Sequence, residues 1–235
     1  MPNVDTKIIS RRFTNMDCRL YAYKIFEALA YSHDNGIMHR DMKPGNMVIN
    51  HDSRELRLID WGLADFYIPE KAYGTSVGTR YFEAPELLLK DKKYNFAIDV
   101  WSTGCILAAW LFKMDKFMKG RDKDHGQILR IVDTLGSQGL HDYLRIYKLP
   151  LPKGMDKVIK NTDNLCLDYY INENNYGRVT QDGLDLLEKI FVYDKFGRIT
   201  AKQALEEHPF FEPIRELLRE EADEQLEKNH NDSTI

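Results

Sequence analysis

The sequence predicts a mainly α-helical fold with one or two short β-hairpins, on the evidence of three stretches. Apolar side chains recur at helical spacing over residues 15–35, as one face of a helix requires. Residues 99–112 are apolar nearly all round, which indicates a helix buried on every side. Two short apolar runs, 47–49 and 56–59, flank a polar turn and predict a hairpin.

Composition is typical of a globular protein with a single core. The 235 residues carry 33 Lys and Arg against 37 Asp and Glu, with a net charge of -4 and a pI of about 6.0. This balance gives no reason to expect nucleic acid or a membrane surface as a partner. The longest apolar run, 105–112, is far shorter than the roughly 20 residues of a membrane span. Three scattered cysteines suit a reducing compartment, so we expect a cytoplasmic or nuclear protein.

The first elements can be placed by their end signals. Asn15 is expected to cap the first helix and Gly36 to end it. The hairpin is expected to turn at His51–Arg54 between its two strands. Residues 60–86, rich in Gly, Pro, Thr and Tyr, predict one long ordered loop, a kind of segment that is usually functional.

The second half of the chain predicts further helices. Residues 113–178 predict a mixture of short helical and turn-like pieces. Amphipathic helices are expected over 180–192 and 200–207. From Ile214 the sequence predicts an acidic helical segment that frays into a disordered, Asn-rich end.

Polar residues on either side of the hairpin carry the candidate chemistry. Asn46 immediately precedes the first strand and Asp60 immediately follows the second. Antiparallel pairing brings these ends side by side, so that an amide oxygen and a carboxylate converge. Mg²⁺ binds proteins through one or two such ligands together with substrate phosphates. Asp41 and Lys43, just before the hairpin, are placed to orient a hydroxyl and to neutralise a transferring phosphoryl group.

These motifs resemble the signature of protein kinases. Residues 39–46 match H-R-D-x-x-x-x-N, residues 60–62 match D-F-G except for a tryptophan, and residues 84–86 match A-P-E. The resemblance continues through 99–104 and 198–200. It implies the fold of a kinase C-terminal lobe, mainly α with short β-hairpins, in which the N-terminal β-rich lobe is absent.

Within the kinases, the chain is most similar to the catalytic (alpha) subunits of casein kinase II, in the CMGC group. Residues 57–67 agree with that family almost throughout, including Trp61 where most kinases have phenylalanine, and residues 37–41 and 80–82 agree too. The resemblance implies a Ser/Thr protein kinase that transfers the γ-phosphoryl group of ATP, with Mg²⁺, to protein substrates. A regulatory subunit or a separate small lobe is a further possible partner.

The resemblance also assigns roles by position. Asp41 is the implied base that accepts the substrate hydroxyl proton, Lys43 contacts the γ-phosphate, and Asn46 and Asp60 are Mg²⁺ ligands. Asp99 is expected to hold the catalytic loop. The remaining implied residues are the floor of the ATP site (Val48, Ile59), the substrate contacts (Thr79, Arg80) and the structural supports (Arg40, Trp61, Asp99, and Arg198 paired with Glu86).

The same resemblance divides the chain into three parts. They are a hinge-like remnant over 1–14, a kinase C-terminal lobe over 15–213 and an acidic tail over 214–235. The lobe is expected to contain the catalytic loop at 39–46, the activation segment at 60–86 and a CMGC-type insert at about 113–178.

The sequence also departs from the family at two points. The 14 residues before the first helix are too few for a five-stranded small lobe, because strands average roughly five to six residues each. No G-x-G-x-x-G or V-A-I-K motif is present, so we expect negligible activity from this polypeptide alone. Ser76 and Glu83 stand where the family carries an arginine and a lysine, which is expected to weaken the selection of acidic substrates.

Two functions of different classes therefore remain open. One is a Ser/Thr kinase truncated to its C-terminal lobe, favoured by the intact set of Asp41, Lys43, Asn46 and Asp60. The other is a catalytically inactive, kinase-like module that binds partner proteins, favoured by the missing small lobe and the altered loop charges. A small lobe encoded in frame upstream of Met1 would decide between them.

Overall fold

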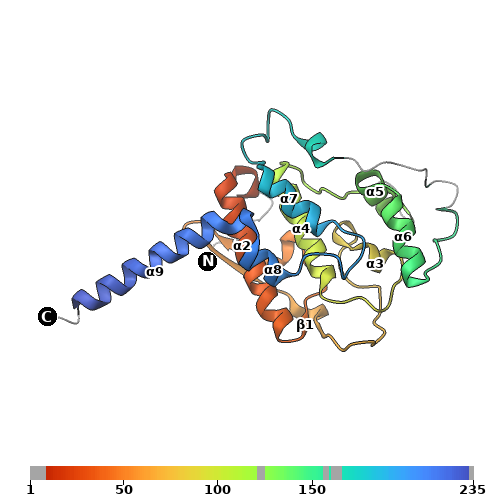
Figure 1. Cartoon of the computed structure of the whole chain (residues 1–235), viewed down its shortest axis with the longest axis horizontal. Helices are drawn as coiled ribbons and strands as arrows, with labels where there is room; N and C mark the ends of the chain where they lie inside the picture. The colour runs from red at the N-terminus through yellow and green to blue at the C-terminus, as the bar shows by residue number, and fades with distance from the viewer. Residues whose placement is uncertain (1–8, 121–124, 156–158, 160–165, 233–235) are drawn as a thin grey trace.

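The protein is a predominantly helical body from which one long helix extends (Figure 1). The computed structural model describes residues 9–120, 125–155, 159 and 166–232. The predicted mainly α-helical fold with few short strands is confirmed. No helix in these ranges is both long enough and apolar enough to cross a membrane.

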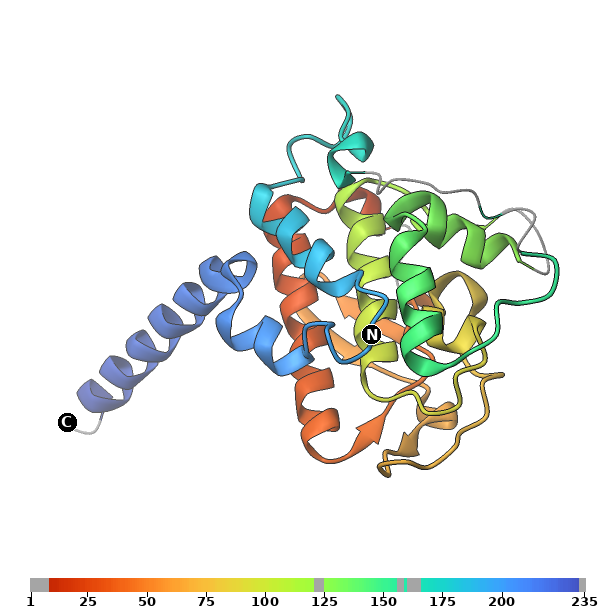
Figure 2. The same ribbon diagram turned by 45° about the vertical axis from the view of Figure 1, so that its right-hand side comes forward.

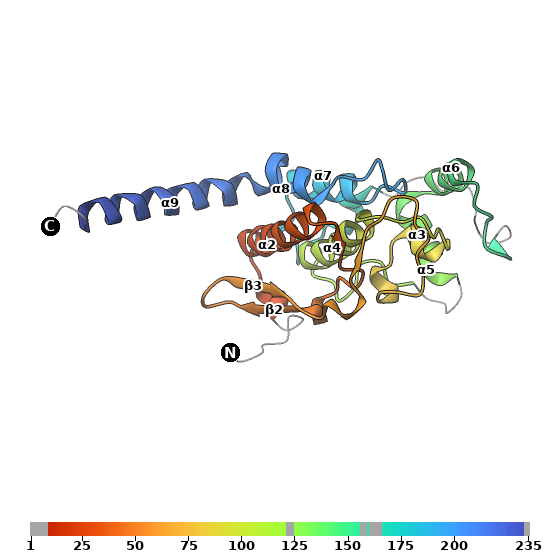
Figure 3. The ribbon, with the colours of Figure 1, turned by 90° about the horizontal axis from the view of Figure 1, so that it is seen from below.

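Two long helices form the centre of the body. Helix α2 (Asn15–Asp34) packs against α4 (Ala97–Leu111), in which every residue except Ser102 is buried. Figure 3 shows α7 (Gln181–Ile190) and α8 (Ala201–Glu207) on one side of this pair and the hairpin strands on the other. The apolar stretch 99–112 predicted this buried helix, which begins at Ala97, two residues earlier than expected.

The start of α2 is capped differently from the prediction. Thr14, not Asn15, is the N-cap: its hydroxyl accepts from the Asp17 amide, and the Asp17 carboxylate accepts from the Thr14 amide. Asn15 instead donates its side-chain amide to the Arg178 carbonyl. The correction has a physical reason, because threonine and aspartate three residues apart satisfy two free backbone donors reciprocally. A short 3₁₀ turn, η1 (Ser10–Arg12), precedes the cap.

The hairpin forms as predicted and a second strand pair accompanies it. β2 (Met47–Asn50) and β3 (Glu55–Leu58) are antiparallel, with Met47 opposite Leu58. β1 (Ile37–Met38) pairs with β4 (Asp65–Phe66), which lies inside the segment predicted to be a single loop. That segment also contains the turns η3 (Trp61–Leu63) and η4 (Arg80–Phe82) and ends in α3 (Pro85–Leu88).

Residues 113–178 are more regular than the sequence indicated. They contain two ten-residue helices, α5 (Gly126–Leu135) and α6 (Gln138–Tyr147), which lie beside α4 in Figure 2. A short turn, η6 (Leu167–Tyr170), follows. Residues 121–124, 156–158 and 160–165 of this predicted insert fall outside the described residues.

The C-terminal segment is also more ordered than predicted. After α8 and the turn η7 (Pro209–Phe211), helix α9 runs from Glu212 to Asp232. The expected fraying of residues 229–232 is therefore wrong, and Ser233 falls outside the described residues. Beyond its first turns α9 leaves the body altogether (Figure 1).

Candidate active site

Asp41 is the residue on which the candidate site converges. The residue is 7% exposed, and its carboxylate accepts three hydrogen bonds. The donors are the Lys43 ammonium at 2.5 Å, the Asn46 side-chain amide at 3.0 Å and the Thr79 hydroxyl at 2.9 Å. Charge-assisted bonds of this kind hold a carboxylate in one orientation. The structure thus brings together three residues of the loop before β2 and one from the activation segment.

Asp99, at the start of the buried helix α4, fixes the backbone of this loop from behind. Its two carboxylate oxygens accept from the amides of His39 and Arg40, each at 2.8 Å, and His33 lies 3.1 Å away. Arg40 has a φ of 68°, a conformation that residues other than glycine rarely adopt. Such a conformation persists where surrounding bonds enforce it, so Asp99 holds the turn that presents Asp41.

The side chain of Arg40 joins the catalytic loop to the start of the activation segment. It donates to the Leu63 carbonyl at 2.6 Å and to the Tyr94 hydroxyl at 3.2 Å, and it lies 3.3 Å from the Asp65 carboxylate. Because these partners come from η3, β4 and the segment before α4, Arg40 connects three parts of the chain.

Asn46 and Asp60 lie at the paired ends of the hairpin. The Ile59 amide donates to the Asn46 carbonyl at 2.9 Å, which extends the strand pairing by one step. The side-chain nitrogen of Asn46 is occupied by Asp41, so its amide oxygen is left as a ligand. Asp60 is exposed, with a φ of 60° and a ψ of 67°. An amide oxygen and a carboxylate fit Mg²⁺ completed by phosphate oxygens, and the described residues contain no larger His, Cys, Asp or Glu cluster for a metal.

Apolar side chains around the hairpin are only partly covered. Val48 is half-buried and Ile59 is 41% exposed. Trp61 is 39% exposed, and its ring contacts the buried His39 with centroids 4.6 Å apart. We call the exposed apolar side chains of this stretch the apolar run: Ile59, Trp61, Leu63, Phe66 and Ile68.

The activation segment approaches the catalytic loop at a glycine. Gly78 has a φ of +83°, and a Cβ on it would lie 3.0 Å from the Arg40 carbonyl oxygen, so a larger residue would push the two segments apart. Thr79 follows and reaches Asp41. Arg80 faces an open hollow of about 770 Å³, which we call the basic hollow. Its charged and imidazole residues are Arg80, Glu83, Lys90, His125 and Lys153.

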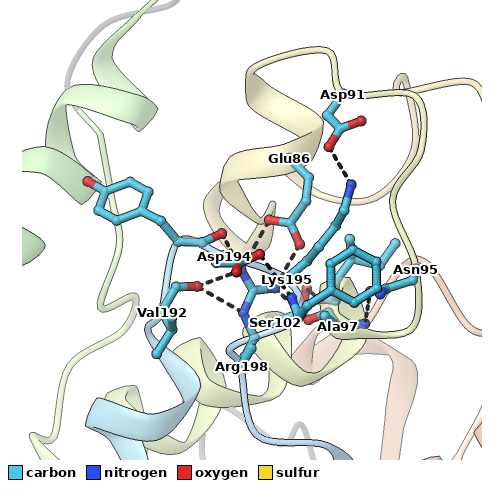
Figure 4. Close-up of polar contacts among 12 residues, drawn as sticks. Glu86, Asp91, Asn95, Ala97, Ser102, Val192, Asp194, Lys195 and Arg198 are labelled. Atoms are coloured by element: carbon cyan, nitrogen blue, oxygen red, sulfur yellow. Dashed lines mark hydrogen bonds and ion pairs between the residues drawn. The ribbon is translucent and has the colours of Figure 1, made fainter. Parts of the chain in front are cut away.

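Figure 4 shows a buried ion pair that anchors the end of the activation segment. Arg198 lies 2.8 and 3.2 Å from the two carboxylate oxygens of Glu86, and both side chains are fully buried. Arg198 also donates to the carbonyls of Val192 and Ala97. The Arg198 guanidinium therefore ties α3 and the start of α4 to the loop after α7.

A second buried ion pair beside it was not foreseen. Lys195 donates to the Asp91 carboxylate at 2.6 Å and to the Lys93 carbonyl at 2.7 Å (Figure 4). Tyr143 donates to the same carboxylate at 2.6 Å. Burial pushes the pKa of Asp91 upward, but the hydrogen bonds from Lys195 and Tyr143 bring it below its usual value. Sequence reasoning missed this pair because Asp91 and Lys195 are 104 residues apart and match no motif.

The residues around Arg80 give another example of what the sequence did not reveal. Lys90, His125 and Lys153 come from three separate segments and were not among the predicted substrate contacts. Their charge alone did not indicate a site in the sequence, because most lysines lie on the solvated surface of a protein. Only the folded chain places them beside Arg80.

The comparison with known protein families agrees with this geometry. The protein kinase domain family matches residues 3–211. The chain therefore belongs to the protein kinase domain family, whose members are phosphotransferases that generally use ATP and Mg²⁺. The match stops where α9 begins.

Proposed function

We propose that this chain is the C-terminal lobe of a Ser/Thr protein kinase similar to the catalytic subunits of casein kinase II. The observation that carries the proposal is the Asp41 carboxylate with its three donors, Lys43, Asn46 and Thr79. Phosphoryl transfer requires positioning and charge stabilisation more than covalent chemistry from the protein. A rigidly oriented carboxylate beside an ammonium meets both requirements.

Each residue of the group has a distinct part in the proposed reaction. Asp41 orients the serine or threonine hydroxyl and accepts its proton as the oxygen attacks phosphorus. Lys43 neutralises negative charge on the transferred group, and Asn46 and Asp60 are the residues that would hold Mg²⁺. ATP supplies the phosphoryl group, and Mg²⁺ offsets the charge of its phosphates.

A small lobe supplied in front of this chain or by a separate polypeptide would complete the nucleotide site. In this proposal Val48 and Ile59 form the floor beneath the adenine ring. The described strands make only two two-stranded pairs, so they do not form the five-stranded sheet of a small lobe. Both faces of a nucleotide must be held for the phosphate to lie in line. Trp61 and the rest of the apolar run would then be covered.

The chemistry of the substrate is proposed from the basic hollow. Ser76 and Glu83 remove positive charge beside Arg80, but Lys90, Lys153 and His125 line the same hollow. We therefore expect a peptide with acidic residues near the phosphorylated serine or threonine to be preferred over a neutral one. A kinase of this kind would act in the cytoplasm or nucleus, where the three free cysteines stay reduced.

The decisive experiment compares the 235-residue chain with a fusion that places a casein kinase II-type small lobe in front of it. Transfer of radiolabelled phosphate from ATP to a peptide library is measured. We expect activity in the fusion and negligible activity in the chain alone. Asp41→Asn should lower the activity of the fusion by about 10²–10⁴-fold, whereas Asp52→Asn, in the exposed hairpin turn, should leave it unchanged.

The outcomes separate the two functional classes. A fusion whose activity does not depend on Asp41 would overturn the enzymatic proposal. That result would favour a kinase-like binding module, in which the exposed side chains of the apolar run are candidates for contact with a partner. Full activity in the chain alone would instead overturn the need for a small lobe.

A further inference from the structure

Helix α9 is a feature that the kinase machinery does not account for. It begins at Glu212, one residue after the matched domain ends, and its exposed part extends away from the body (Figures 1 and 3). Its base is anchored by the buried Ile214 and by Arg215, which donates to the Leu205 carbonyl at 2.8 Å. Residues 218–226 are all exposed.

One face of α9 carries a row of carboxylates. Glu216, Glu220 and Asp223 are spaced four and three residues apart, so they lie on the same side of the helix. The row is about 10 Å long, at 1.5 Å per residue. Among the described side chains, none of the three has a basic partner within ion-pair distance. Arg219 is the basic residue next to this row, and it is paired with Glu212. Like charges at this spacing destabilise a helix, so a positively charged surface placed against this face would stabilise it.

The basic hollow is such a surface. Arg80, Lys90 and Lys153 all line it, and within the part of the chain that the structure describes none of them forms an ion pair. His125 adds an imidazole, and Glu83 is the only carboxylate among the described lining residues. Three cations around an open hollow match, in number and in sign, the three carboxylates of the helix.

The positions of the basic hollow and of α9 determine whether the helix can bind the hollow of its own copy or only that of another copy. The hollow lies beside α3 and α5, since Leu88 and His125 line it. In Figure 1 these helices are at the opposite end of the body from the exposed part of α9, which runs away from them. The helix of one copy therefore cannot reach its own hollow, although it is free to reach that of a neighbour.

We propose that α9 of one copy docks its row of carboxylates, Glu216, Glu220 and Asp223, in the basic hollow of a second copy. The contact is head to tail, so it continues into longer assemblies unless the rotation between copies closes a ring. Thr79 and Arg80 adjoin the hollow. If the proposed kinase function holds, a docked helix therefore competes with acidic peptides for the same surface.

Sedimentation of the whole chain in solution tests the docking without any assay of activity. We expect concentration-dependent association that weakens by at least about tenfold between roughly 0.1 M and 1 M NaCl, as the screening length falls from about 10 Å to 3 Å. Association through the apolar run would respond in the opposite direction, because salting-out conditions strengthen apolar contacts. A monomer at both salt concentrations, or association that strengthens with salt, would overturn the proposal.

Charge reversal identifies the two surfaces. A helix variant (Glu216→Lys, Glu220→Lys, Asp223→Lys) and a hollow variant (Lys90→Glu, Lys153→Glu) should each be monomeric, and mixing them should restore association. The matched control reverses three exposed acids elsewhere, Glu55→Lys, Glu173→Lys and Glu206→Lys, and should associate like the unmodified chain. A control that loses association as fully as the helix variant, or a mixture that stays monomeric, would overturn the assignment.

Discussion

Two groups of residues in and around the candidate site differ sharply in burial. In the first group, Asp99 and Arg198 are 1% and 3% exposed, and each makes several hydrogen bonds at about 3 Å or less. In the second group, Ile59, Trp61 and Leu63 are between 39% and 41% exposed. We call the first group, together with Glu86, the rear support; the second belongs to the apolar run.

The difference shows which surroundings of Asp41 the described residues fix by themselves. Within the rear support, Asp99 fixes the backbone next to Asp41 by accepting from the amides of His39 and Arg40, and Arg198 with Glu86 ties α3 to the start of α4. The apolar run has no comparable cover among the described residues. Substitutions of exposed side chains usually change stability little. The two groups are therefore expected to respond very differently to substitution.

The rear support should give the largest effect. Replacing Arg198 by methionine leaves the Glu86 carboxylate buried without its partner, and breaking such a pair costs about 3–5 kcal/mol. Urea denaturation of the two proteins measures the loss in the free energy of unfolding. The exposed pair of Lys189 and Asp185 is the matched control, and Lys189→Met should cost less than about 1 kcal/mol. An equal loss in the free energy of unfolding for Arg198→Met and Lys189→Met would contradict the expectation that the buried pair stabilises the fold more than the exposed pair.

An intermediate effect is expected from pH, through the neighbouring ion pair. Hydrogen bonds from Lys195 and Tyr143 outweigh burial and hold the pKa of Asp91 below its usual 3.8. The folded state therefore binds fewer protons than the unfolded state near this pH. The stabilising contribution is fully present above pH 3.8 and is lost as the pH falls through the lower, folded-state pKa.

Acid unfolding of an Asp91→Asn variant tests this expectation. The variant should be less stable than the unmodified chain at neutral pH, and the difference should shrink as the solution is acidified below pH 3.8. Asp52→Asn, in the exposed hairpin turn, serves as the control and should follow the unmodified chain throughout. If the difference in stability between Asp91→Asn and the unmodified chain stays constant as the pH falls below 3.8, ionisation of Asp91 does not stabilise the folded state.

The apolar run should give the smallest effect on stability. Phe66 is 64% exposed, so Phe66→Ser should change the free energy of unfolding by no more than about 1 kcal/mol. Phe26→Ser, in the core where the ring is fully buried, should cost more than about 3 kcal/mol. The same urea denaturation measures both. A loss above about 3 kcal/mol for Phe66→Ser would mean that the ring is part of the core and not a surface that awaits a partner.

Much of the site could be predicted because its members are close in sequence. Asp41, Lys43 and Asn46 lie within six residues, and the hairpin that follows joins Asn46 to Ile59. The strands and the buried helix α4 were visible in the hydrophobic pattern, since that pattern depends on local periodicity. The N-cap was missed for a small reason: Thr14 and Asn15 are both good caps, and only the reciprocal bond with Asp17 selects the threonine.

Other contacts could not be predicted because they join distant parts of the chain. The pairing of β1 with β4 links residues 37–38 to 65–66, and both strands have only two residues. Strands this short have too little pattern to be recognised by alternation. Helices α5 and α6 were also underestimated, although each is a regular ten-residue helix.

The sequence by itself determined that this protein is a mainly α-helical member of the protein kinase domain family, with Asp41, Asn46 and Asp60 around one hairpin. These features follow from motifs and periodicities that operate over a few turns of chain. The tertiary structure alone decided that Lys195 meets Asp91, that Lys90 and Lys153 line one hollow with Arg80, and that the exposed part of α9 extends away from the body. Such contacts depend on how whole helices pack, and packing is set by the shape of the entire core rather than by any local pattern.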